Sequence, residues 1–534
     1  MDLEDWFLTV EERGNPSTLL DLRRRTGEAW TTGNRVEVLV DGDEYFRRLY
    51  RVLCSLGPDD WAHFTDWEGD ADELLAGPGT EVGRVLAEAA RRGVDVRGLL
   101  WRSHPRQAHF AEQDNVGFTK TVDEAGGEVL LDERVRRGGS HHQKLVIARH
   151  GEGSDRDVAY AGGIDLCHGR HDDPRHGGDV QAIDIAAPYG PRPPWHDMQL
   201  EVHGPAIGDL SYTFRERWED PTPLDHRNPW RRAIRHFTKQ PRQPDPLPPE
   251  RDDPPPCGPH AVQVVRTYPA KRPRYPFAPQ GERSVARAYL KAIGRARSLV
   301  YLEDQYLWSI DAAHALADAL QRHPALRVIA VVPRFADRDA RGTRAAASIG
   351  RAYLTEILRR AGGDRVTVYD LENEAGTPIY VHAKVCVIDD VWAVVGSDNL
   401  NRRSWTHDSE ISCSVIDTTP DDREPVDPGG LGDGARLLAR ETRLRLWREH
   451  TGRAADDDGD LCDPVTGYDA LLRSADELDR WHAAGGQGPR PPGHLRKHPP
   501  EHVSVWARWW AQTIHRVVLD PDGRPRRLAR AGRY

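Results

Sequence analysis

Short apolar runs alternate with amphipathic segments along the first half of the chain. Runs of apolar and β-branched residues predict strands, and apolar residues three and four positions apart predict helices. The expected strands are Arg35–Val40, Trp61–Thr65, Val94–Trp101, Glu128–Leu131, Lys144–Ala148 and Asp157–Ala161, and the expected helices are Asp43–Leu56 and Val82–Arg92. This alternation predicts an α/β fold in which helices cover a sheet.

The same alternation restarts after residue 259. The expected strands are Val262–Arg266, Leu299–Leu302, Leu326–Val332, Arg365–Tyr369, Ile379–Ile388 and Val391–Val395, and the expected helices are Arg283–Ala296, Ala312–Arg322 and Arg344–Ala361. In each half, a strand carrying His-x-Lys is followed by a strand that leads into Gly-Gly or Gly-Ser. The repeat predicts two similar α-β-α sandwich halves related by a pseudo-two-fold axis.

A proline-rich segment separates the two halves. Residues 241–259 hold nine prolines, which prevent a helix or a central strand and favour a stiff surface linker. We therefore expect an N-terminal half over residues 1–240, this linker, a C-terminal half over 260–455 and a C-terminal extension over 456–534.

The extension contains a tryptophan- and arginine-rich segment, Val505–Trp510, followed by further arginines. Tryptophan and arginine together suit a lipid headgroup region, so the segment could be an interfacial anchor. The alternative, which we favour, is a terminal helix that packs its tryptophans on the core. The sequence assigns no function to the rest of the extension.

Composition narrows the class of protein. With 38% hydrophobic and 30% charged residues, and no apolar run long enough to cross a bilayer, the chain is expected to be a globular protein. The first residues lack a secretory signal, which predicts a cytoplasmic location. The six scattered cysteines indicate reduced thiols rather than disulfides or a zinc site. The net charge of −10 argues against a protein that coats nucleic acid.

The candidate chemistry lies in two His-x-Lys motifs, at His142 and His382, which are 240 residues apart (382 − 142). Alternate side chains of a strand share a face, so each histidine is expected to point the same way as its lysine. The second motif continues to Asp389, and then to Gly396, Ser397 and Asn399, whose side chains and backbone can surround a small anion.

Two imidazoles and two ammonium groups suit displacement at a phosphodiester. One histidine can attack phosphorus while the other protonates the leaving oxygen, and two lysines can neutralise the phosphoryl oxygens. No metal or cofactor is required for this chemistry. Only seven of the 74 basic residues are lysine, so lysine at both motif positions indicates a chemical requirement for a compact ammonium.

These stretches resemble the phospholipase D superfamily, and within it the phospholipase D enzymes proper. Residues 382–399 match the signature H-x-K-x4-D-x6-G-S-x-N. The other similar stretches are His141–Lys144, Gly162–Arg170, Pro194–Met198, Tyr301–Tyr306, Asn399–Ser404 and Asp408–Glu410, in an order that also matches over about residues 35–450.

The resemblance implies roles for individual residues. His142 would attack phosphorus to form a phosphohistidine, and His382 would protonate the leaving alcohol and then activate water, although the pseudo-symmetry leaves the reverse assignment open. Lys144, Lys384 and Asn399 would hold the phosphate, with Ser397 beside them. The remaining roles are Glu410 as the carboxylate that orients His382, Asp165 or Asp172 as the one that orients His142, and Asp389 as the motif aspartate.

The first motif departs from the pattern because Arg149 stands where the family has the motif aspartate. If Arg149 pointed inward, it would change the charge of the pocket. We nevertheless expect a phospholipase D-type phosphoric diester hydrolase that releases phosphatidate and the headgroup alcohol, with transphosphatidylation as a second outcome. The alternatives are a nuclease or other phosphodiesterase on the same fold, and a non-catalytic scaffold. The expected partner is a phospholipid, met at the membrane periphery by a monomer, with no nucleic acid.

Overall fold

The computed structural model describes residues 1–24, 27–102, 112–151, 154–224, 244–337, 341–501 and 505–534. Its strands build two mixed sheets that meet at one shared strand, β1 (Thr31–Val40). The N-terminal part of β1 pairs with β9 (His260–Tyr268) and its C-terminal part pairs antiparallel with β8 (Met198–His203). The two halves are therefore joined by backbone hydrogen bonds as well as by side chains.

The strand order is the same in both sheets. The first sheet runs β1, β8, β6 (Val158–Gly162), β5 (Leu145–Arg149), β2 (Trp61–Asp66), β3 (Asp95–Trp101) and β4 (Glu128–Asp132). The second runs β9, β17 (Glu410–Asp417), β16 (Trp392–Gly396), β15 (Val385–Ile388), β11 (Leu299–Glu303), β12 (Arg327–Val331) and β13 (Val366–Glu372). This repeat confirms the two similar α/β halves expected from the sequence.

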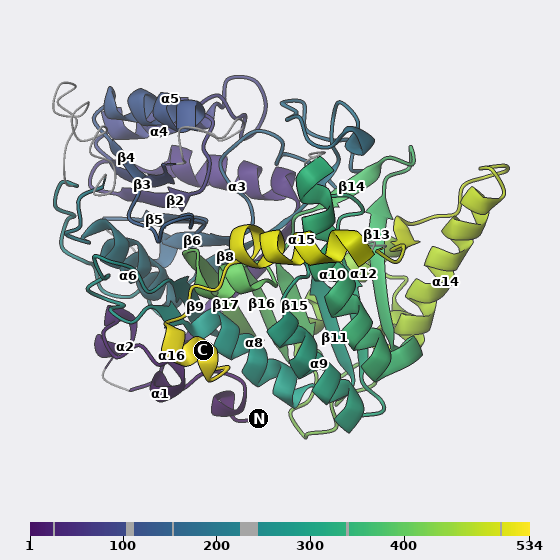
Figure 1. The fold of residues 1–534 in the computed structure, drawn as a ribbon. Helices are drawn as coiled ribbons and strands as arrows, with labels where there is room; N and C mark the ends of the chain where they lie inside the picture. Colours follow the sequence, from purple (N-terminus) through teal and green to yellow (C-terminus); the bar gives the residue numbers. More distant parts are fainter. Residues whose placement is uncertain (25–26, 103–111, 152–153, 225–243, 338–340, 502–504) are drawn as a thin grey trace.

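Amphipathic helices cover the outer face of each sheet (Figure 1). The first half carries α3 (Gly42–Ser55), α4 (Val82–Arg91) and α5 (Glu112–Asp123), and the second carries α8 (Ser284–Arg295), α9 (Ile310–Arg322) and α10 (Arg341–Gly362). The inner faces share one large core, to which α6 (Ala206–Trp218) and α12 (Leu437–Thr451) contribute residues such as Phe214 and Trp447. Each sheet is thus buried between helical layers.

Both ends of the chain pack on the second half. Trp6 and Phe7 enter its outer core together with Tyr534. The Arg287 side chain donates to Glu12 O and, at 3.1 Å, to Tyr534 O, which places the two termini near each other (Figure 1). In the extension, β18 (Leu495–Lys497) pairs with β13, and α14 (Pro464–Ala483) packs beside it. Residues beyond 455 therefore complete the second half.

The tryptophan-rich segment forms helix α15 (Val505–Ile514), which lies along α10. Ala511 is buried against Ala346 and Ile349 of α10, whereas Trp510 is exposed. The side chains of residues 505–509 lie outside the described residues, so the interfacial and docked alternatives remain predictions. The described part of the linker, residues 244–259, forms no helix or strand.

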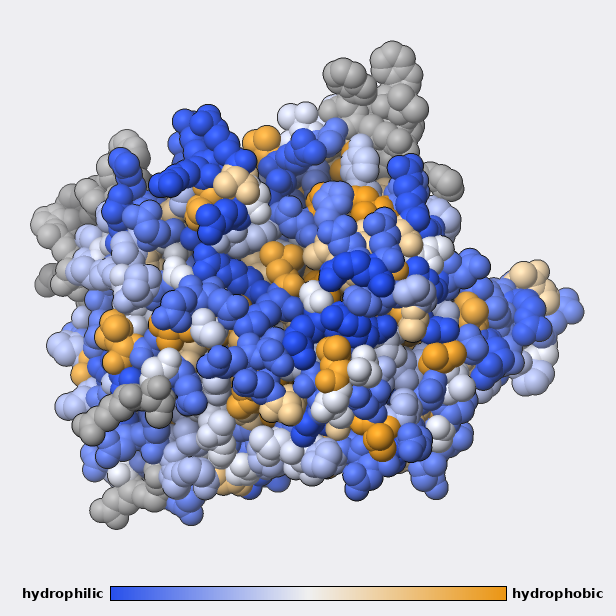
Figure 2. Space-filling view, turned by 90° about the horizontal axis from the view of Figure 1, so that it is seen from below, coloured by the Kyte–Doolittle hydropathy of each residue, from blue (hydrophilic) through white to orange (hydrophobic). Residues whose placement is uncertain are grey.

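The surface shows small groups of apolar residues scattered among hydrophilic ones on the face drawn in Figure 2. Among the helices in the described ranges, none combines the length and apolar character that a bilayer crossing requires.

Buried ion pairs fix the loop between β15 and β16. Asp390 has a positive φ and accepts hydrogen bonds from Arg440 at 2.9 Å and Arg443 at 2.6 Å, with all three side chains buried. We expect Asp390→Asn to lower the free energy of unfolding by about 3 kcal/mol or more, since it leaves two buried guanidinium groups short of negative charge.

Urea denaturation of the variant measures this loss. The control is Glu356→Gln, which removes the partner of Arg360 in an exposed pair and should cost less than about 0.5 kcal/mol. Equal effects of the two substitutions would contradict the assignment of Asp390 as a structural anchor.

Candidate active site

The two motif histidines lie in breaks between strands. His142 precedes β5, and His382 lies between β14 (Pro378–Val381) and β15. The sequence predicted one continuous strand over residues 379–388, and this was wrong. The backbone leaves the sheet here because His142 N donates to Ser409 O at 3.0 Å, and His382 N donates to His196 O at 2.7 Å. Each motif is thus held by the opposite half.

Each imidazole also binds a carboxylate of the opposite half. His142 Nδ1 lies 2.8 Å from Glu410 Oε2, and His382 Nδ1 lies 2.6 Å from Asp197 Oδ2. The expectation that Glu410 orients His382 was therefore wrong. Each histidine is oriented by a carboxylate of the other half and not by one of its own half. Neither Nε2 atom has a hydrogen-bond partner within the ranges that the structure describes, so this nitrogen can react.

Asp197 was missed as an orienting residue. It belongs to the Pro194–Met198 stretch that carries the family resemblance, and this stretch was the available signal. Glycine at residue 163 leaves room for the Asp197 carboxylate, because a Cβ at Gly163 would lie only 2.1 Å from Asp197 Oδ1. In the second half Ser397 stands at the equivalent position, after Gly396, and its hydroxyl donates to Glu410. The Asp197 carboxylate therefore lies against the backbone at Gly163, whereas the Glu410 carboxylate is bound by the Ser397 hydroxyl.

The two carboxylates proposed for His142 bind elsewhere. Asp165 Oδ1 lies 3.4 Å from Lys144 Nζ, and Asp172 accepts backbone N–H groups, including that of Trp195 at 2.8 Å. Both assignments were wrong. Burial would raise the pKa of Asp165, but Lys144, Arg170, His142 and His382 together lower it. Asp165 lies two residues after Gly163, whose position abuts the Asp197 carboxylate that binds His382, so Lys144 of the first motif and His382 of the second meet in one site.

Both motif lysines are buried beside this carboxylate. Lys144 Nζ donates to His142 O at 3.2 Å, and Lys384 Nζ donates to His382 O. Burial lowers the pKa of Lys384 to about 8; the Asp197 carboxylate opposes this shift and the Lys144 ammonium adds to it. The two cations therefore face the same region, where they can bind an anion together.

Ser397 and Asn399 have different surroundings. Ser397 Oγ donates to Glu410 Oε2 at 2.6 Å and accepts from Ile411 N at 3.0 Å, so it supports the carboxylate rather than a phosphate. The Asn399 side chain is buried, and its Oδ1 has no hydrogen-bond partner among the described residues. Asn399 and Asp165 hold equivalent positions three residues after Gly396 and Gly162. An amide oxygen accepts hydrogen bonds, so Asn399 would hold a phosphate through the N–H groups of its side chain and not through Oδ1.

The motif aspartate lies away from the imidazoles. Asp389 follows β15, at the end opposite to His382, and accepts the backbone N–H groups of Arg297, Ser298 and Leu299 at 2.7–2.9 Å. Burial raises its pKa to about 6, against the effect of these hydrogen bonds. The inclusion of Asp389 among the catalytic residues was wrong, because its carboxylate anchors the loop before β11.

Arg149 occupies the corresponding end of β5. Its Nε donates to Asp157 Oδ2 at 2.8 Å and its Nη1 to Glu250 Oε1 at 3.1 Å. Two acidic side chains therefore neutralise it at the far end of the strand. The departure from the family pattern does not place a charge in the site.

The electrostatics of the two histidines differ. Burial and then the neighbouring lysine lower the pKa of both, that of His382 to about 3 and that of His142 well below the usual value. Burial opposes ionisation of Asp197, but His382 and Lys384 hold its pKa far below the usual value. Burial and then Asp408 raise the pKa of Glu410 well above its usual value. Asp197, beside His382, is therefore ionised more readily than Glu410, beside His142.

Aromatic rings line both sides of the site. Trp67 meets the His142 ring edge-on at 6.5 Å, and Trp195 lies 5.1 Å from the His382 ring. The guanidinium of Arg170 lies over Trp195 at 4.2 Å. These rings restrict water around the imidazoles and contribute to the burial that lowers their pKa values.

Comparisons with known proteins agree with this geometry. The family model described as "Phospholipase D" matches residues 61–229, and the one described as "Cardiolipin synthase, PLD-like domain" matches residues 289–421. Phospholipase D alpha 1 of Brassica oleracea var. capitata is 25% identical over 568 residues, covering 82% of this chain and 67% of that protein. Phospholipase D A of Dictyostelium discoideum is 28% identical over 372 residues, covering 59% of this chain and 27% of that protein.

Among solved structures, the phosphatidylserine synthase of Haemophilus influenzae aligns with a TM-score of 0.49 and 14% identity, covering 72% of this chain and 82% of that one. Two facing His-x-Lys motifs on duplicated α/β halves define a phosphodiesterase site, and the family models match one in each half. The chain belongs to the phospholipase D superfamily.

Substitution of Gly163 tests the position of Asp197. A methyl group in Gly163→Ala would displace the carboxylate that orients His382, so we expect kcat/KM for a simple phosphodiester to fall by about 10²-fold or more. The matched control is Gly57→Ala, whose Cβ would have no neighbour within 4 Å, and which should keep its activity. An unchanged rate in a folded Gly163→Ala protein would contradict the positioning of His382 by Asp197.

Titration of Lys384 predicts the alkaline limb of the pH profile. With a pKa of about 8, Lys384 is charged below this pH and loses its charge as pH rises through it. We expect kcat/KM to fall about tenfold per pH unit above about pH 8, and Lys384→Arg to lose this limb because arginine stays protonated. An unchanged limb in Lys384→Arg would show that another group titrates there.

Proposed function

We propose that the protein hydrolyses glycerophospholipids to phosphatidate and the headgroup alcohol through a phosphohistidine intermediate. The observation that carries this proposal is the pair of imidazoles, each bound through Nδ1 to a carboxylate and each with an Nε2 that has no partner among the residues the structure describes. The similarity to proteins named phospholipase D alpha 1 and phospholipase D A supports a phospholipid substrate.

His142 is the proposed nucleophile. Its carboxylate partner, Glu410, has a raised pKa and so favours a neutral imidazole, which a nucleophile requires. His382 is paired with Asp197, which stays ionised and can stabilise an imidazolium. With a pKa of about 3, His382 is neutral before substrate binds, and the negative charge of a bound phosphodiester added to that of Asp197 must raise this pKa for His382 to carry a proton. His382 is therefore the proposed general acid.

The reaction proceeds in two displacements. His142 Nε2 attacks phosphorus, the bond from phosphorus to the headgroup oxygen breaks, and His382 gives its proton to that oxygen. His382 then takes a proton from water, the resulting oxygen attacks phosphorus, and the phosphorus–nitrogen bond breaks. Lys144, Lys384 and Asn399 stabilise the phosphoryl oxygens in both steps.

A covalent intermediate can transfer its phosphatidyl group either to water or to an alcohol. Once the first alcohol departs, a second alcohol can replace water, and the product is then a transphosphatidylated lipid. Contact with a membrane surface would be needed to reach the substrate. We propose a peripheral contact by a monomer, since each half already supplies one motif to the site.

The test measures headgroup release from vesicles of phosphatidylcholine, phosphatidylethanolamine and phosphatidylglycerol, beside cleavage of single-stranded DNA. We expect release from at least one lipid, and a loss of about 10³-fold or more in His142→Ala and in His382→Ala. Quenching in alkaline detergent, in which the phosphorus–nitrogen bond of a phosphohistidine is stable, should trap labelled phosphate on the wild-type chain and on His382→Ala, but not on His142→Ala.

The control is His63→Gln, which changes a buried histidine that is bound to Asp95 outside the site. Cleavage of DNA without headgroup release would assign the site to a nuclease. Label retained on His142→Ala and lost from His382→Ala would reverse the roles of the two histidines, and inactivity on every substrate would favour a scaffold.

A further inference from the structure

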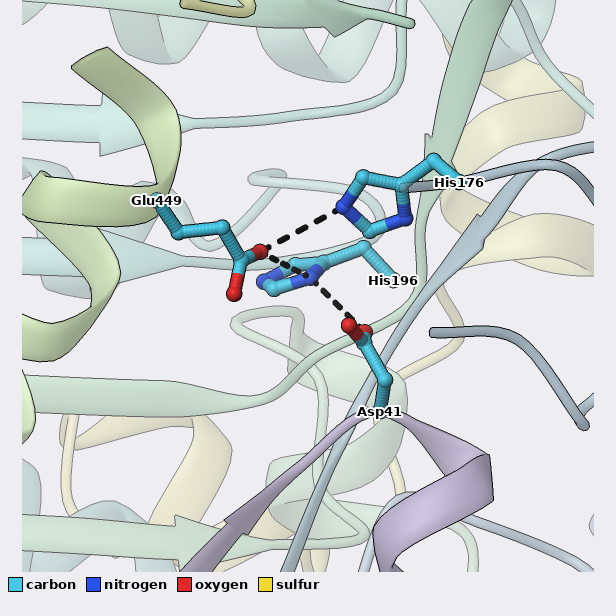
Figure 3. Close-up of side chains that lie close together, drawn as sticks. All are labelled: Asp41, His176, His196 and Glu449. Atoms are coloured by element: carbon cyan, nitrogen blue, oxygen red, sulfur yellow. Dashed lines mark hydrogen bonds and ion pairs between the residues drawn. The ribbon is translucent and has the colours of Figure 1, made fainter. Parts of the chain in front are cut away.

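A second group of histidines and carboxylates lies beside the active site and takes no part in the proposed reaction. Asp41, His176, His196 and Glu449 point toward one another (Figure 3), and their ligand atoms all lie within 4.8 Å of one another. Asp41 follows β1, His176 lies in the loop before β7 (Trp195–His196), and Glu449 comes from α12 of the second half. The group therefore spans the seam between the halves.

The spacing suits four ligands around one small cation. Asp41 Oδ1 lies 3.0 Å from His196 Nδ1, and Glu449 Oε1 lies 3.4 Å from His196 Nδ1 and 3.3 Å from His176 Nε2. Metal–ligand bonds of about 2.0–2.1 Å in a tetrahedron place neighbouring ligand atoms about 3.3 Å apart. These three separations are close to this edge length, and the other pairs of ligand atoms lie within 4.8 Å, so a bound ion would draw them closer.

The outer nitrogens of both rings are held by acceptors. His196 Nε2 lies 2.8 Å from Glu303 Oε2, and His176 Nδ1 lies 3.1 Å from Trp195 O. Each acceptor keeps a proton on the outer nitrogen and leaves the inner one to bind. Histidines that bind metals nearly always have such a partner, which sets the tautomer and the ring orientation.

One carboxylate oxygen of the cluster has no hydrogen-bond partner within the described residues. Asp41 is 1% exposed, and its Oδ2 has no hydrogen-bond partner among the described residues. A buried carboxylate oxygen without a partner is costly, and a cation bound by Asp41 through both of its oxygens would satisfy it. The four residues could also neutralise one another as protonated imidazoles between carboxylates, but that arrangement leaves this oxygen unpaired.

We propose that Asp41, His176, His196 and Glu449 bind one divalent transition-metal ion of the zinc class with tetrahedral coordination. Two imidazoles favour such an ion over Ca²⁺ or Mg²⁺, which prefer oxygen ligands. Two carboxylates balance the charge of a dication, so the site is neutral when filled. The four ligands are spread from residue 41 to residue 449, so no local spacing in the sequence indicates a metal.

The ion would act as a structural link next to the reaction. His196 accepts the His382 backbone N–H through its carbonyl oxygen, and Asp197, which follows it, orients the His382 ring. Fixing His196 would therefore fix both groups that position His382. The proposal does not depend on the substrate, because none of the four ligands has a role in the proposed reaction.

The experiment measures metal content and coordination in full-length protein without a polyhistidine tag. After growth with added Zn²⁺ and extensive dialysis, we expect about one zinc ion per chain by elemental analysis. Replacement by Co²⁺ should give the intense visible absorption of a tetrahedral site. His176→Gln and the near-isosteric Glu449→Gln should each weaken Zn²⁺ binding by about 10²-fold or more.

Two matched variants locate the ion. His63→Gln changes a buried histidine bound to a single carboxylate, and His142→Ala removes an active-site imidazole; both should retain the ion. The proposal would be overturned by less than stoichiometric zinc in the wild type, by an octahedral cobalt spectrum, by retention of zinc in both ligand variants, or by its loss in His142→Ala. Because these readouts need no substrate, failure here leaves the proposed phospholipid reaction to its own test.

Discussion

The exchange of hydrogen bonds across the seam between the halves is the constraint on which this site depends. His142 takes its backbone acceptor and its carboxylate from the second half, and His382 takes both of its partners from the first. Neither half can orient its own histidine. A single chain therefore completes one site only when both halves fold and dock, and the shared strand β1 with its two pairings keeps them in register.

The site concentrates charge in a place where burial penalises charge. Lys144 and Lys384 are almost fully buried, and Asp165 and Asp197 offset them. These carboxylates stabilise the buried ammonium groups until a phosphate binds. The phosphate oxygens can then replace the water that burial removed from the two lysines. The neighbouring Asp41 cluster follows the same principle, with two carboxylates facing two imidazoles in the same seam.

The ends of β5 and β15 that lie far from the imidazoles show that a residue of a recognised motif need not take part in the reaction. Asp389 anchors the backbone of residues 297–299, and Arg149 at the equivalent end of β5 pairs with Asp157 and Glu250. Both positions stabilise a loop at the end of the strand opposite to the imidazole. Opposite charges can fill the two positions, since each needs only a local partner and neither reaches the phosphate.

The duplicated α/β architecture and the two His-x-Lys motifs could be predicted from the sequence, because strand and helix periodicity and the local motif are properties of neighbouring residues. It predicted His142, His382 and both lysines at one site, and the geometry brings them together. The three-dimensional packing of the halves was needed to see that Glu410 orients His142 and that Asp197 orients His382. It also placed Asp165 on Lys144 and took Asp389 out of the site. The pairings of His142 with Glu410 and of His382 with Asp197 join residues more than 180 positions apart across a pseudo-symmetric seam, and a linear pattern cannot distinguish a partner in the same half from one in the other.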